Sequence, residues 1–274
     1  IDEVQLRLIN KASFFYTRDT ASLDHLLSLH PACPVVEFAP DATFAIDLAD
    51  KKQTEAYLSE AGLKKGEYIC VIPRLRYTPY FQMRNLVPTE DEKGKYQVSQ
   101  FYKEVDHEKL REVIIRWVRD TGLKVLLCPE VVYQVELGKE MLLDPLPDDV
   151  KKNVVWRGTY WLPDLAEGVY AQAHSLICFE PHSPIMALRH GVPSIYLRQP
   201  TDTRKGQMWR DLGLGEWIFE IDITAGSQIY DALKEINTHY DKALKKVGRA
   251  QDIIAKRQKI SMKQLRDSAY NTTK

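Results

Sequence analysis

Residues 176–205 read LICFEPHSPIMALRHGVPSIYLRQPTDTRK, and this stretch indicates the fold more clearly than any other part of the chain. The apolar run 176–179 predicts a buried strand, and residues 193–198 predict a second one. Between them Gly191 supplies the left-handed residue that ends a short helix. A strand, a helix and a strand in this order are typical of a parallel sheet in an α/β protein.

Polar residues lie where the first of these strands ends. His182 follows the strand, Ser183 stands at the expected helix N-cap, and Pro184 stands at the first helical position. In open α/β sheets ligands bind at the carboxyl ends of the strands, and a helix N-terminus favours an anion there. Three cations follow the second strand, namely Arg198, Arg204 and Lys205. The pattern therefore predicts a site for a carboxylate or a phosphate.

From about residue 66 onward, apolar runs alternate with segments of helical period. The clearest helix is 106–120, whose apolar residues follow the i, i+3, i+4, i+7 pattern, and Gly122 closes it. Expected strands are 67–73, 124–128, 153–157 and 217–221, and further expected helices are 131–142, 160–174, 207–212 and 227–239. Strands separated by helices predict a Rossmann-like parallel sheet covered on both faces.

The first 60 residues predict part of a second α/β lobe, with strands at 13–18 and 34–38 around a helix at 20–29. The polar stretch 49–66 predicts a connection between lobes, and 77–102 predicts a long polar loop with four tyrosines. The expected domains are 1–60, the remainder of an N-terminal lobe; 61–240, a C-terminal Rossmann-like lobe; and 241–274, a basic amphipathic helix.

The composition excludes several classes of protein. The formal net charge of the 274 residues is 0, so no overall positive field draws the chain to nucleic acid. No run of about 18 apolar residues could span a membrane, and no cleavable signal is visible. The cysteines form no C-x-x-C pair, which favours buried free thiols over a zinc site or disulfides; they are Cys33, Cys70, Cys128 and Cys178. We therefore expect a cytoplasmic protein without a metal.

Residues 241–274 are strongly basic, with ten Lys and Arg against three Asp. Their apolar residues fall roughly on one face of a helix; they are Ala243, Val247, Ala250, Ile254 and Leu265. One interpretation is a peripheral contact with an anionic membrane surface. The other, which we favour, is a terminal helix packed on the body with a solvated basic face, because the apolar stripe is thin and lacks Trp and Phe.

Three segments, in this order, resemble motifs of one family. Residues 15–22 (FYTRDTAS) resemble an x-x-x-R-D-x-x-S motif, and residues 40–44 (PDATF) resemble a D-P-A-F-like motif. Residues 182–205 resemble the run H-x-x-I-x-A-x-x-x-G-x-P-x-I followed by a lysine or arginine. Together the three resemble the polysaccharide pyruvyl transferases over nearly the whole chain.

This resemblance implies a two-lobed fold similar to that of the GT-B glycosyltransferases. It also implies transfer of the pyruvyl unit of phosphoenolpyruvate, a co-substrate used without a further cofactor, to a saccharide or lipid-linked glycan acceptor. Such reactions belong to the synthesis of exopolysaccharides and cell-wall glycans. No segment matches the Gly-Asn-x-Gly-Asp-like turn of the family's first lobe, so we expect most of that lobe to lie outside this chain.

A second departure from the family lies directly before the histidine. The usual Arg-Leu is replaced here by Glu180-Pro181, which exchanges a cation for an anion beside the expected phosphate. Ketal transfer requires an acid for the methylene carbon and a base for the attacking hydroxyl. His182 is the candidate, because the pKa of a histidine lies near neutrality. The alternative is a histidine that only hydrogen-bonds its neighbours.

Arginines at strand ends are the candidate ligands of the donor anion. Arg18 matches the functional arginine of the family, and a salt bridge to Asp19 or Asp24 is the alternative. Arg74 and Arg76 follow strand 67–73 and could hold a phosphate or carboxylate in bidentate fashion, or lie solvated in a loop.

Arg204 and Lys205 match the family's cation after the second strand, although Asp202 and Asp211 could pair with them on the surface. Glu180 could act as a general base, contact sugar hydroxyls or cap the helix dipole.

Two other functions stay open. In a GT-B glycosyltransferase that uses a nucleotide sugar, Glu180 would contact sugar or ribose hydroxyls and the helix N-terminus at Ser183 would bind the diphosphate. The other is a non-catalytic lobe that binds a glycan or a partner, which the Glu180-Pro181 replacement and the missing lobe favour.

Overall fold

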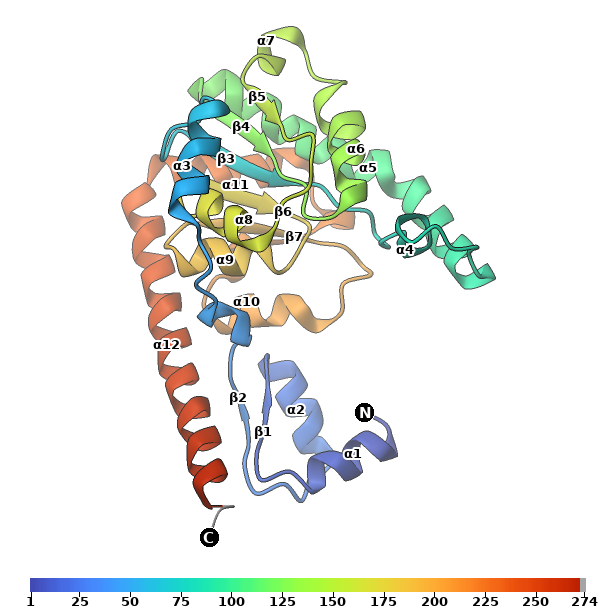
Figure 1. Cartoon of the computed structure of the whole chain (residues 1–274), viewed down its shortest axis with the longest axis vertical. Coiled ribbons are helices and arrows are strands. Elements are labelled where there is room, and N and C mark those ends of the chain that lie inside the picture. Colours follow the sequence, from blue (N-terminus) through green and yellow to red (C-terminus); the bar gives the residue numbers. More distant parts are fainter. Residues whose placement is uncertain (272–274) are drawn as a thin grey trace.

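A parallel sheet of six strands forms the centre of the larger of two lobes, in the order β5-β4-β3-β6-β7-β8 (Figure 1). The computed structural model describes residues 1–271, and of Lys205 and Asn271 the backbone alone. The strands are β3 (Tyr68–Ile72), β4 (Lys124–Leu127), β5 (Val154–Trp156), β6 (Ser175–Cys178), β7 (Ser194–Arg198) and β8 (Ile218–Glu220). Every neighbouring pair is parallel, which confirms the predicted α/β fold class.

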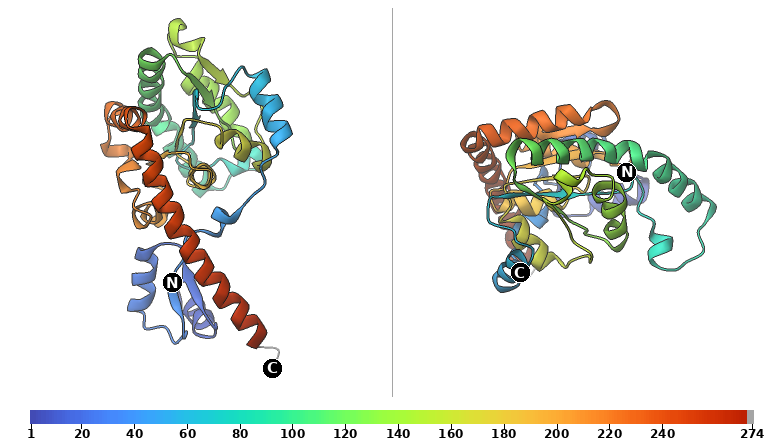
Figure 2. Two further views of the ribbon diagram at one scale, coloured as in Figure 1. Left: turned by 90° about the vertical axis from the view of Figure 1, so that its left-hand side faces the viewer. Right: turned by 90° about the horizontal axis from the view of Figure 1, so that it is seen from above.

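Helices cover both faces of this sheet (Figure 2). The helices α5 (Glu90–Thr121) and α11 (Gly226–Thr238) pack together on one face, and α3 (Lys51–Glu60), α8 (Pro163–Tyr170) and α9 (Ser183–Arg189) lie on the other. The remaining elements of this lobe are α4 (Tyr80–Met83), α6 (Val132–Gly138) with a π-helical turn at Lys139–Leu143, α7 (Asp148–Lys151) and α10 (Gln207–Asp211). All five residues of β3 are buried, as expected of a strand covered on both faces.

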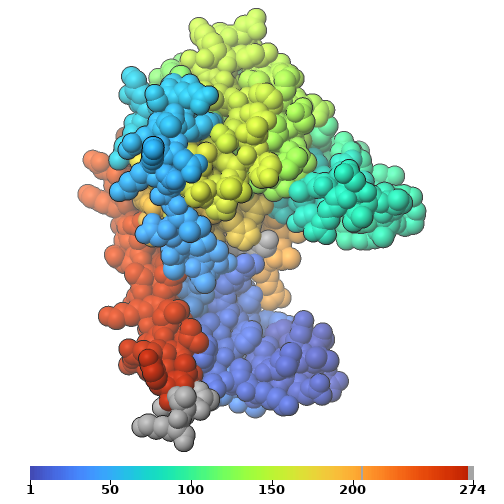
Figure 3. Space-filling model, in the orientation of Figure 1, coloured from blue at the N-terminus to red at the C-terminus, as the bar shows by residue number. Residues whose placement is uncertain are grey.

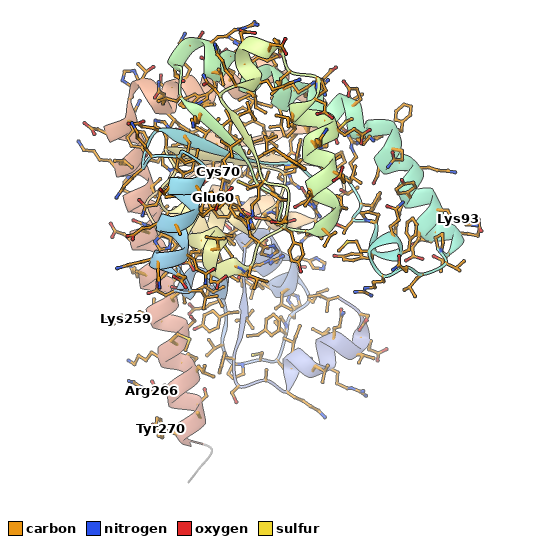
Figure 4. The ribbon with its side chains drawn as sticks, turned by 45° about the horizontal axis from the view of Figure 1, so that its top comes forward. Glu60, Cys70, Lys93, Lys259, Arg266 and Tyr270 are labelled. Carbon is orange, nitrogen blue, oxygen red and sulfur yellow. The ribbon has the colours of Figure 1, made fainter. Side chains whose placement is uncertain are left out.

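The predicted ends of two helices are confirmed. Gly122 follows α5 with φ +69°, and Gly191 follows α9 with φ +84°. Both glycines adopt the left-handed conformation that L-residues with a Cβ rarely accept. The four cysteines are buried and unpaired, and Cys70 lies in the middle of the sheet (Figure 4).

The smaller lobe contains α1 (Glu3–Asn10), β1 (Phe15–Thr17), α2 (Thr20–Ser28) and β2 (Val36–Phe38), and its two strands are parallel. It has its own small hydrophobic cluster around Ile9, Leu26 and Cys33. The stretch 49–66 contains the helix α3 rather than an extended connection. Leu58 of α3, like Phe44 before it, belongs to the hydrophobic cluster of the large lobe, so that lobe includes residues ahead of 61.

The expected loop at 77–102 is mostly helical. The helix α5 begins at Glu90, where the side chains and backbone of Thr89 and Glu92 form a capping box. Because this half of α5 is exposed, it has no apolar stripe, and the sequence reads as polar loop. Residues 77–105, which we call the arm, project from the large lobe, and Lys93 marks their outer part (Figure 4).

The last helix, α12 (Tyr240–Asn271), extends from the large lobe along the small one (Figure 1). Four of the five residues in its predicted stripe are buried, namely Ala243, Val247, Ala250 and Ile254. In its distal half, Ile260, Met262 and Tyr270 are exposed but point in different directions around the helix at 100° per residue. The first four residues of the stripe therefore pack on the body, whereas the fifth, Leu265, is exposed. Membrane contact through this helix stays a prediction.

None of the helices within residues 1–271 is both long and apolar enough to cross a membrane.

Candidate functional site

Charged side chains converge at the carboxyl edge of the large sheet. Arg74 follows β3, Glu130 follows β4, Glu180 follows β6 and Asp202 follows β7. Because the strands are parallel, their carboxyl ends lie at one edge, where α/β proteins bind ligands. The site is therefore assembled from residues that are up to 128 positions apart in the chain.

Arg74 lies between two carboxylates at this edge. Its Nη1 is 2.8 Å from Oδ1 of Asp202, and its Nε is 3.4 Å from Oε2 of Glu180. Burial alone would lower the pKa of Arg74, but the charges of Glu180 and Asp202 raise it above its usual value. The expected donor ligand Arg74 thus already holds two protein anions.

His182 forms a hydrogen bond with Glu180, whose Oε1 lies 2.8 Å from Nδ1 of the imidazole. An ionised carboxylate can only accept, so the proton is assigned to Nδ1, and Nε2 is left as the reactive nitrogen. The side chain of Glu180 is 18% exposed and that of His182 is 47% exposed. Glu180 therefore orients an accessible histidine, a role that the sequence did not specify.

His182 and Arg18 line the same narrow cavity. Its volume is about 10 Å³, and the other residues that line it are Asp41, Pro181, Ile185, Tyr196, Met208 and Trp209. We call it the His182 cavity. Arg18 comes from the small lobe and His182 from the large one, so two residues predicted for one site do come together there.

The two N-terminal motifs are joined in space by an ion pair. Nη1 of Arg18 is 3.0 Å from Oδ2 of Asp41, so its partner is neither Asp19 nor Asp24. Burial would raise the pKa of Asp41, but hydrogen bonds from Thr43 and Arg18 outweigh burial and lower it.

The motif around Arg18 has a local structural explanation. Asp19 is the N-cap of α2, and its carboxylate accepts hydrogen bonds from the backbone N–H and the hydroxyl of Ser22, at 2.7 and 2.8 Å. This capping fixes the end of β1 and hence the position from which Arg18 extends.

Ser183 is not the N-cap of its helix. His182 occupies the N-cap position without a capping bond, and Ser183 is the first residue of α9. The backbone of His182 is already helical, with φ −89° and ψ −36°, because the chain turns directly out of β6. Within the described part of the chain, the buried hydroxyl of Ser183 has no hydrogen-bond partner.

Arg76 is fixed in the interior rather than open to a donor. Its guanidinium forms a bidentate pair with Asp106, at 2.9 and 2.7 Å, and also contacts Asp222. The ring of Tyr102 stacks 3.5 Å from its Cζ. Only 4% of the Arg76 side chain is exposed. It anchors the root of the arm to the sheet.

The cations after β7 lie at the boundary between the lobes. A cavity of about 550 Å³ is lined by Ala21 of α2 and by Arg198, Thr203, Arg204 and Arg210, and we call it the interlobe cavity. Arg204 donates to the carbonyl oxygen of Ala21 at 3.2 Å. Among residues 1–271, no carboxylate lies within ion-pair distance of Arg204. The side chain of Lys205 lies outside the described residues.

The guanidinium of Arg198 is bound mostly by groups of the protein itself. Its Nη1 is 2.5 Å from Oε1 of Glu220, and its Nη2 donates to the carbonyl oxygens of Asp202 and Thr203. Nearby, Asp211 of α10 accepts from both the backbone N–H and the hydroxyl of Thr20, at 2.8 and 2.6 Å. These bonds hold α10 against the N-terminus of α2.

Glu130 and its partner Tyr170 were missed by the sequence analysis. The hydroxyl of Tyr170 donates to Oε1 of Glu130 at 3.1 Å. Burial, with the nearby charge of Glu180, raises the pKa of Glu130 to about 8. The position of Glu130 just after a predicted strand was the available signal, the same one that singled out Arg74.

A metal centre finds no support in the described residues, where no three His, Cys, Asp or Glu side chains are arranged to hold one. The site contains the oriented His182 and the paired Arg74, and two cavities of about 590 and 550 Å³ lie near this edge of the sheet. Such an arrangement can move a proton and bind a small anion beside a larger polar ligand.

A family model described as "Polysaccharide pyruvyl transferase" matches residues 6–199. No curated protein matches the chain. Solved structures with a similar fold include the UDP complex of S. aureus MnaA, at 13% identity and a TM-score of 0.55 over 90% of this chain and 58% of that one. They also include UGT2 of Phytolacca americana, at 13% identity and a TM-score of 0.54, over 98% of this chain and 56% of that one.

A UDP-forming trehalose-phosphate synthase from Burkholderia xenovorans is similar at 9% identity with a TM-score of 0.55, over 97% of this chain and 64% of that one. At these identities the likeness concerns the fold, and it confirms the predicted GT-B-like architecture. The chain spans about three fifths of the length of these structures.

Proposed function

Because this chain belongs to the polysaccharide pyruvyl transferase family, we propose that it transfers the pyruvyl group of phosphoenolpyruvate to hydroxyls of a saccharide, free or lipid-linked. The observation that supports this best is the His182–Glu180 pair at the carboxyl end of β6, which faces Arg18 across the His182 cavity. A histidine held by a carboxylate beside a cation suits proton transfer to an anionic substrate.

The proposed reaction has two steps. In the first, the methylene carbon of phosphoenolpyruvate takes up a proton, and the oxygen of one sugar hydroxyl forms a bond to the adjacent carbon. In the second, a neighbouring hydroxyl attacks the same carbon, and the bond between this carbon and the phosphate oxygen breaks. The proton of the second hydroxyl leaves with the phosphate. The products are a ketal that bridges two hydroxyls and one inorganic phosphate.

We assign proton transfer to Nε2 of His182, because Nδ1 is held by Glu180. In this assignment protonated His182 supplies the methylene proton and, once neutral, accepts a proton from a sugar hydroxyl. Glu180 stabilises the protonated imidazole and fixes its orientation, which is how a carboxylate beside a catalytic histidine acts.

We assign the donor's anionic groups to Arg18 and Arg204. Arg18 lines the His182 cavity together with His182, and Arg204 contributes to the interlobe cavity a guanidinium that has no carboxylate partner among residues 1–271 and donates to the carbonyl oxygen of Ala21. The His182 cavity holds roughly one water molecule as it stands, so donor binding there requires the lobes to separate slightly.

The test is phosphate release from phosphoenolpyruvate in the presence of saccharides, with the ketal detected by NMR. We expect His182→Ala to reduce the rate by about a hundredfold or more, since general acid–base catalysis contributes on the order of 10²–10⁴. His239 serves as the matched control, because it is also an exposed histidine beside a glutamate, 3.7 Å from Glu235. If both alanine variants retain full activity, the assigned mechanism is wrong.

A second candidate, a glycosyltransferase that uses a nucleotide sugar, is favoured by the UDP named in the descriptions of the MnaA and UGT2 structures. Thermal-shift titration with phosphoenolpyruvate and with UDP-N-acetylglucosamine separates the two candidates. We expect phosphoenolpyruvate to stabilise the protein. Stabilisation by the nucleotide sugar alone would overturn the proposed donor.

A further inference from the structure

The arm borders a cavity that His182 does not line and to which the donor was not assigned. Its volume is about 590 Å³, and it lies between the arm and the carboxyl end of β3. We call it the arm cavity. Figure 3 shows the arm projecting from the large lobe, above the small lobe. Pockets for small ligands have volumes of roughly 300–1,000 Å³, so the arm cavity is large enough for one to three sugar rings.

Aromatic rings form much of the arm cavity. Tyr77, Tyr80, Phe81 and Tyr96 all line it, and Phe81 packs edge-on against Tyr96 with centroids 5.6 Å apart. Tyr80 is 55% exposed. A tyrosine ring presents an apolar face with a polar tip, which matches a sugar ring with its C–H face and its hydroxyls.

The position of Tyr77 is fixed by the buried residue Ser99. The Ser99 hydroxyl accepts from the N–H of Tyr77 at 3.0 Å and lies 3.2 Å from its carbonyl oxygen. Arg76, the residue directly before Tyr77, is held in turn by its bond to Asp106. The backbone at the start of the aromatic wall is therefore held in place before a ligand arrives, which lowers the entropy cost of binding.

The charges of the arm cavity disfavour an anionic ligand. Lys95 is paired with Asp91 at 2.5 Å, and Arg74 and Arg76 are each paired with two carboxylates. Every cation that lines the cavity is thus already compensated. Thr78 and Thr201 line the cavity with uncharged hydroxyls, of which that of Thr201 donates to the carbonyl oxygen of Arg76 and is left as an acceptor. The arm cavity is suited to a neutral polar ligand, whereas the interlobe cavity is suited to an anion.

A single turn after β7 separates the two cavities. Thr201 lines the arm cavity, and the next two residues, Asp202 and Thr203, line the interlobe cavity. Arg74 lines the arm cavity and also bonds Asp202 across this turn. A neutral ligand on one side of the turn and an anion on the other are therefore placed as neighbours.

We propose that the arm cavity is the acceptor subsite, which binds an uncharged saccharide by stacking on Tyr80 and its aromatic neighbours. The assignment of this cavity to the acceptor rests on the proposed function, but saccharide binding itself does not depend on phosphoenolpyruvate. The arm thus recognises the acceptor, and the lobe boundary holds the donor.

The test is calorimetric titration of the full chain with cellotriose, β-1,4-galactotriose and tri-N-acetylchitotriose, without phosphoenolpyruvate. We expect at least one of them to bind and Tyr80→Ala to weaken that binding about tenfold, which corresponds to one aromatic contact. Tyr80→Phe keeps the ring and should keep the affinity, whereas Tyr80→Leu should not. Because Tyr80 is exposed, these variants are expected to fold.

Phe101→Ala is the matched control, since Phe101 is an exposed aromatic residue of the same arm, 74% accessible, that does not line the cavity. Absence of binding by all three saccharides, or equal weakening by Tyr80→Ala and Phe101→Ala, overturns the inference. If phosphate release proceeds but its saccharide KM is unchanged in Tyr80→Ala, the inference fails while the proposed function stands. If saccharides bind through Tyr80 but no transfer occurs, the saccharide site stands while the proposed function fails.

Discussion

The carboxyl edge of the large sheet and the interlobe cavity are built from the same residue types in opposite proportions. At the sheet edge, Arg74 and Arg76 are surrounded by Glu180, Asp202 and Asp106. The interlobe cavity is lined by three arginines; Arg198 and Arg210 share the carboxylate of Glu220, and Arg204 has no carboxylate within ion-pair distance among residues 1–271. Position after a strand therefore does not by itself make an arginine a ligand for an external anion, because the count of nearby carboxylates decides what it binds.

The largest expected effect is on stability at the sheet edge. Arg76→Ala leaves Asp106 buried without its partner, and breaking a buried ion pair in this way costs about 3–5 kcal/mol. Urea denaturation measures the free energy of unfolding. Arg119→Ala is the matched control, since Arg119 pairs with Asp149 on an exposed helix surface, and it should leave stability unchanged. Equal stability of the two variants would show that the buried pair contributes nothing.

At the interlobe cavity the effect should fall on binding instead. Arg204→Ala removes a guanidinium whose one protein contact within residues 1–271 is the carbonyl oxygen of Ala21. Hydrogen bonds to charged groups contribute about 1.5–3 kcal/mol, so we expect the Kd for phosphoenolpyruvate to rise roughly tenfold to a hundredfold. The unfolding curve should not move. A Kd equal to that of the wild type would remove Arg204 from the donor site.

The burial of Glu130 beside the charge of Glu180 at the sheet edge predicts a pH dependence. The pKa of Glu130 is raised to about 8 from an ordinary value of 4.5, so between these values the folded state retains a proton that the unfolded state has lost. Stability therefore falls as pH rises through this window, by about 1.4 kcal/mol per pH unit for one proton. Glu130→Gln should abolish this fall.

Two buried histidines act in the opposite direction at lower pH. Burial lowers the pKa of His107 and of His174 to about 4 from 6.5, so the unfolded state binds more protons between these values and stability rises with pH there. The effect of Glu130 is therefore best measured from pH 6.5 to 8, by urea denaturation of the wild type and Glu130→Gln. If the free energy of unfolding changes with pH in the same way in both proteins, Glu130 is ionised in the folded protein.

The smallest expected effect concerns the contact between the lobes. Asp211→Ala removes two hydrogen bonds to Thr20, each of which contributes about 1 kcal/mol. We expect a modest loss of stability together with a higher KM for phosphoenolpyruvate, because residues of α2 and of α10 both line the interlobe cavity. Arg204→Ala should change the KM alone. An unchanged KM in Asp211→Ala would mean that this contact does not shape the cavity.

The sequence predicted the sheet well because its signals are local. Buried strands of four or five apolar residues and a glycine after a helix are visible in any short window, as with Gly122 and Gly191. The exposed half of α5 was missed, because a helix surrounded by water has no apolar stripe. Its capping residues Thr89 and Glu92 were the available signal.

The site was predicted in outline, and its pairings were not. His182, Arg18 and Arg204 lie where strand ends and motifs place them. The partners of Arg76 are 30 and 146 positions away in the chain, and a single sequence contains no information on such distant contacts. Glu130 was not predicted, because a carboxylate is not expected at a site for an anion. The N-cap was misplaced by one residue because the chain turns into α9 at His182 itself.

The helix α12 has a mechanical consequence for catalysis. It is 32 residues long, begins against the large lobe and reaches the small lobe, where Arg257 lies 3.6 Å from Glu37. A continuous helix resists bending along its axis, so the lobes cannot swing apart freely to admit a substrate. If donor binding separates the lobes, we therefore expect them to rotate about this helix or its far end to detach from the small lobe.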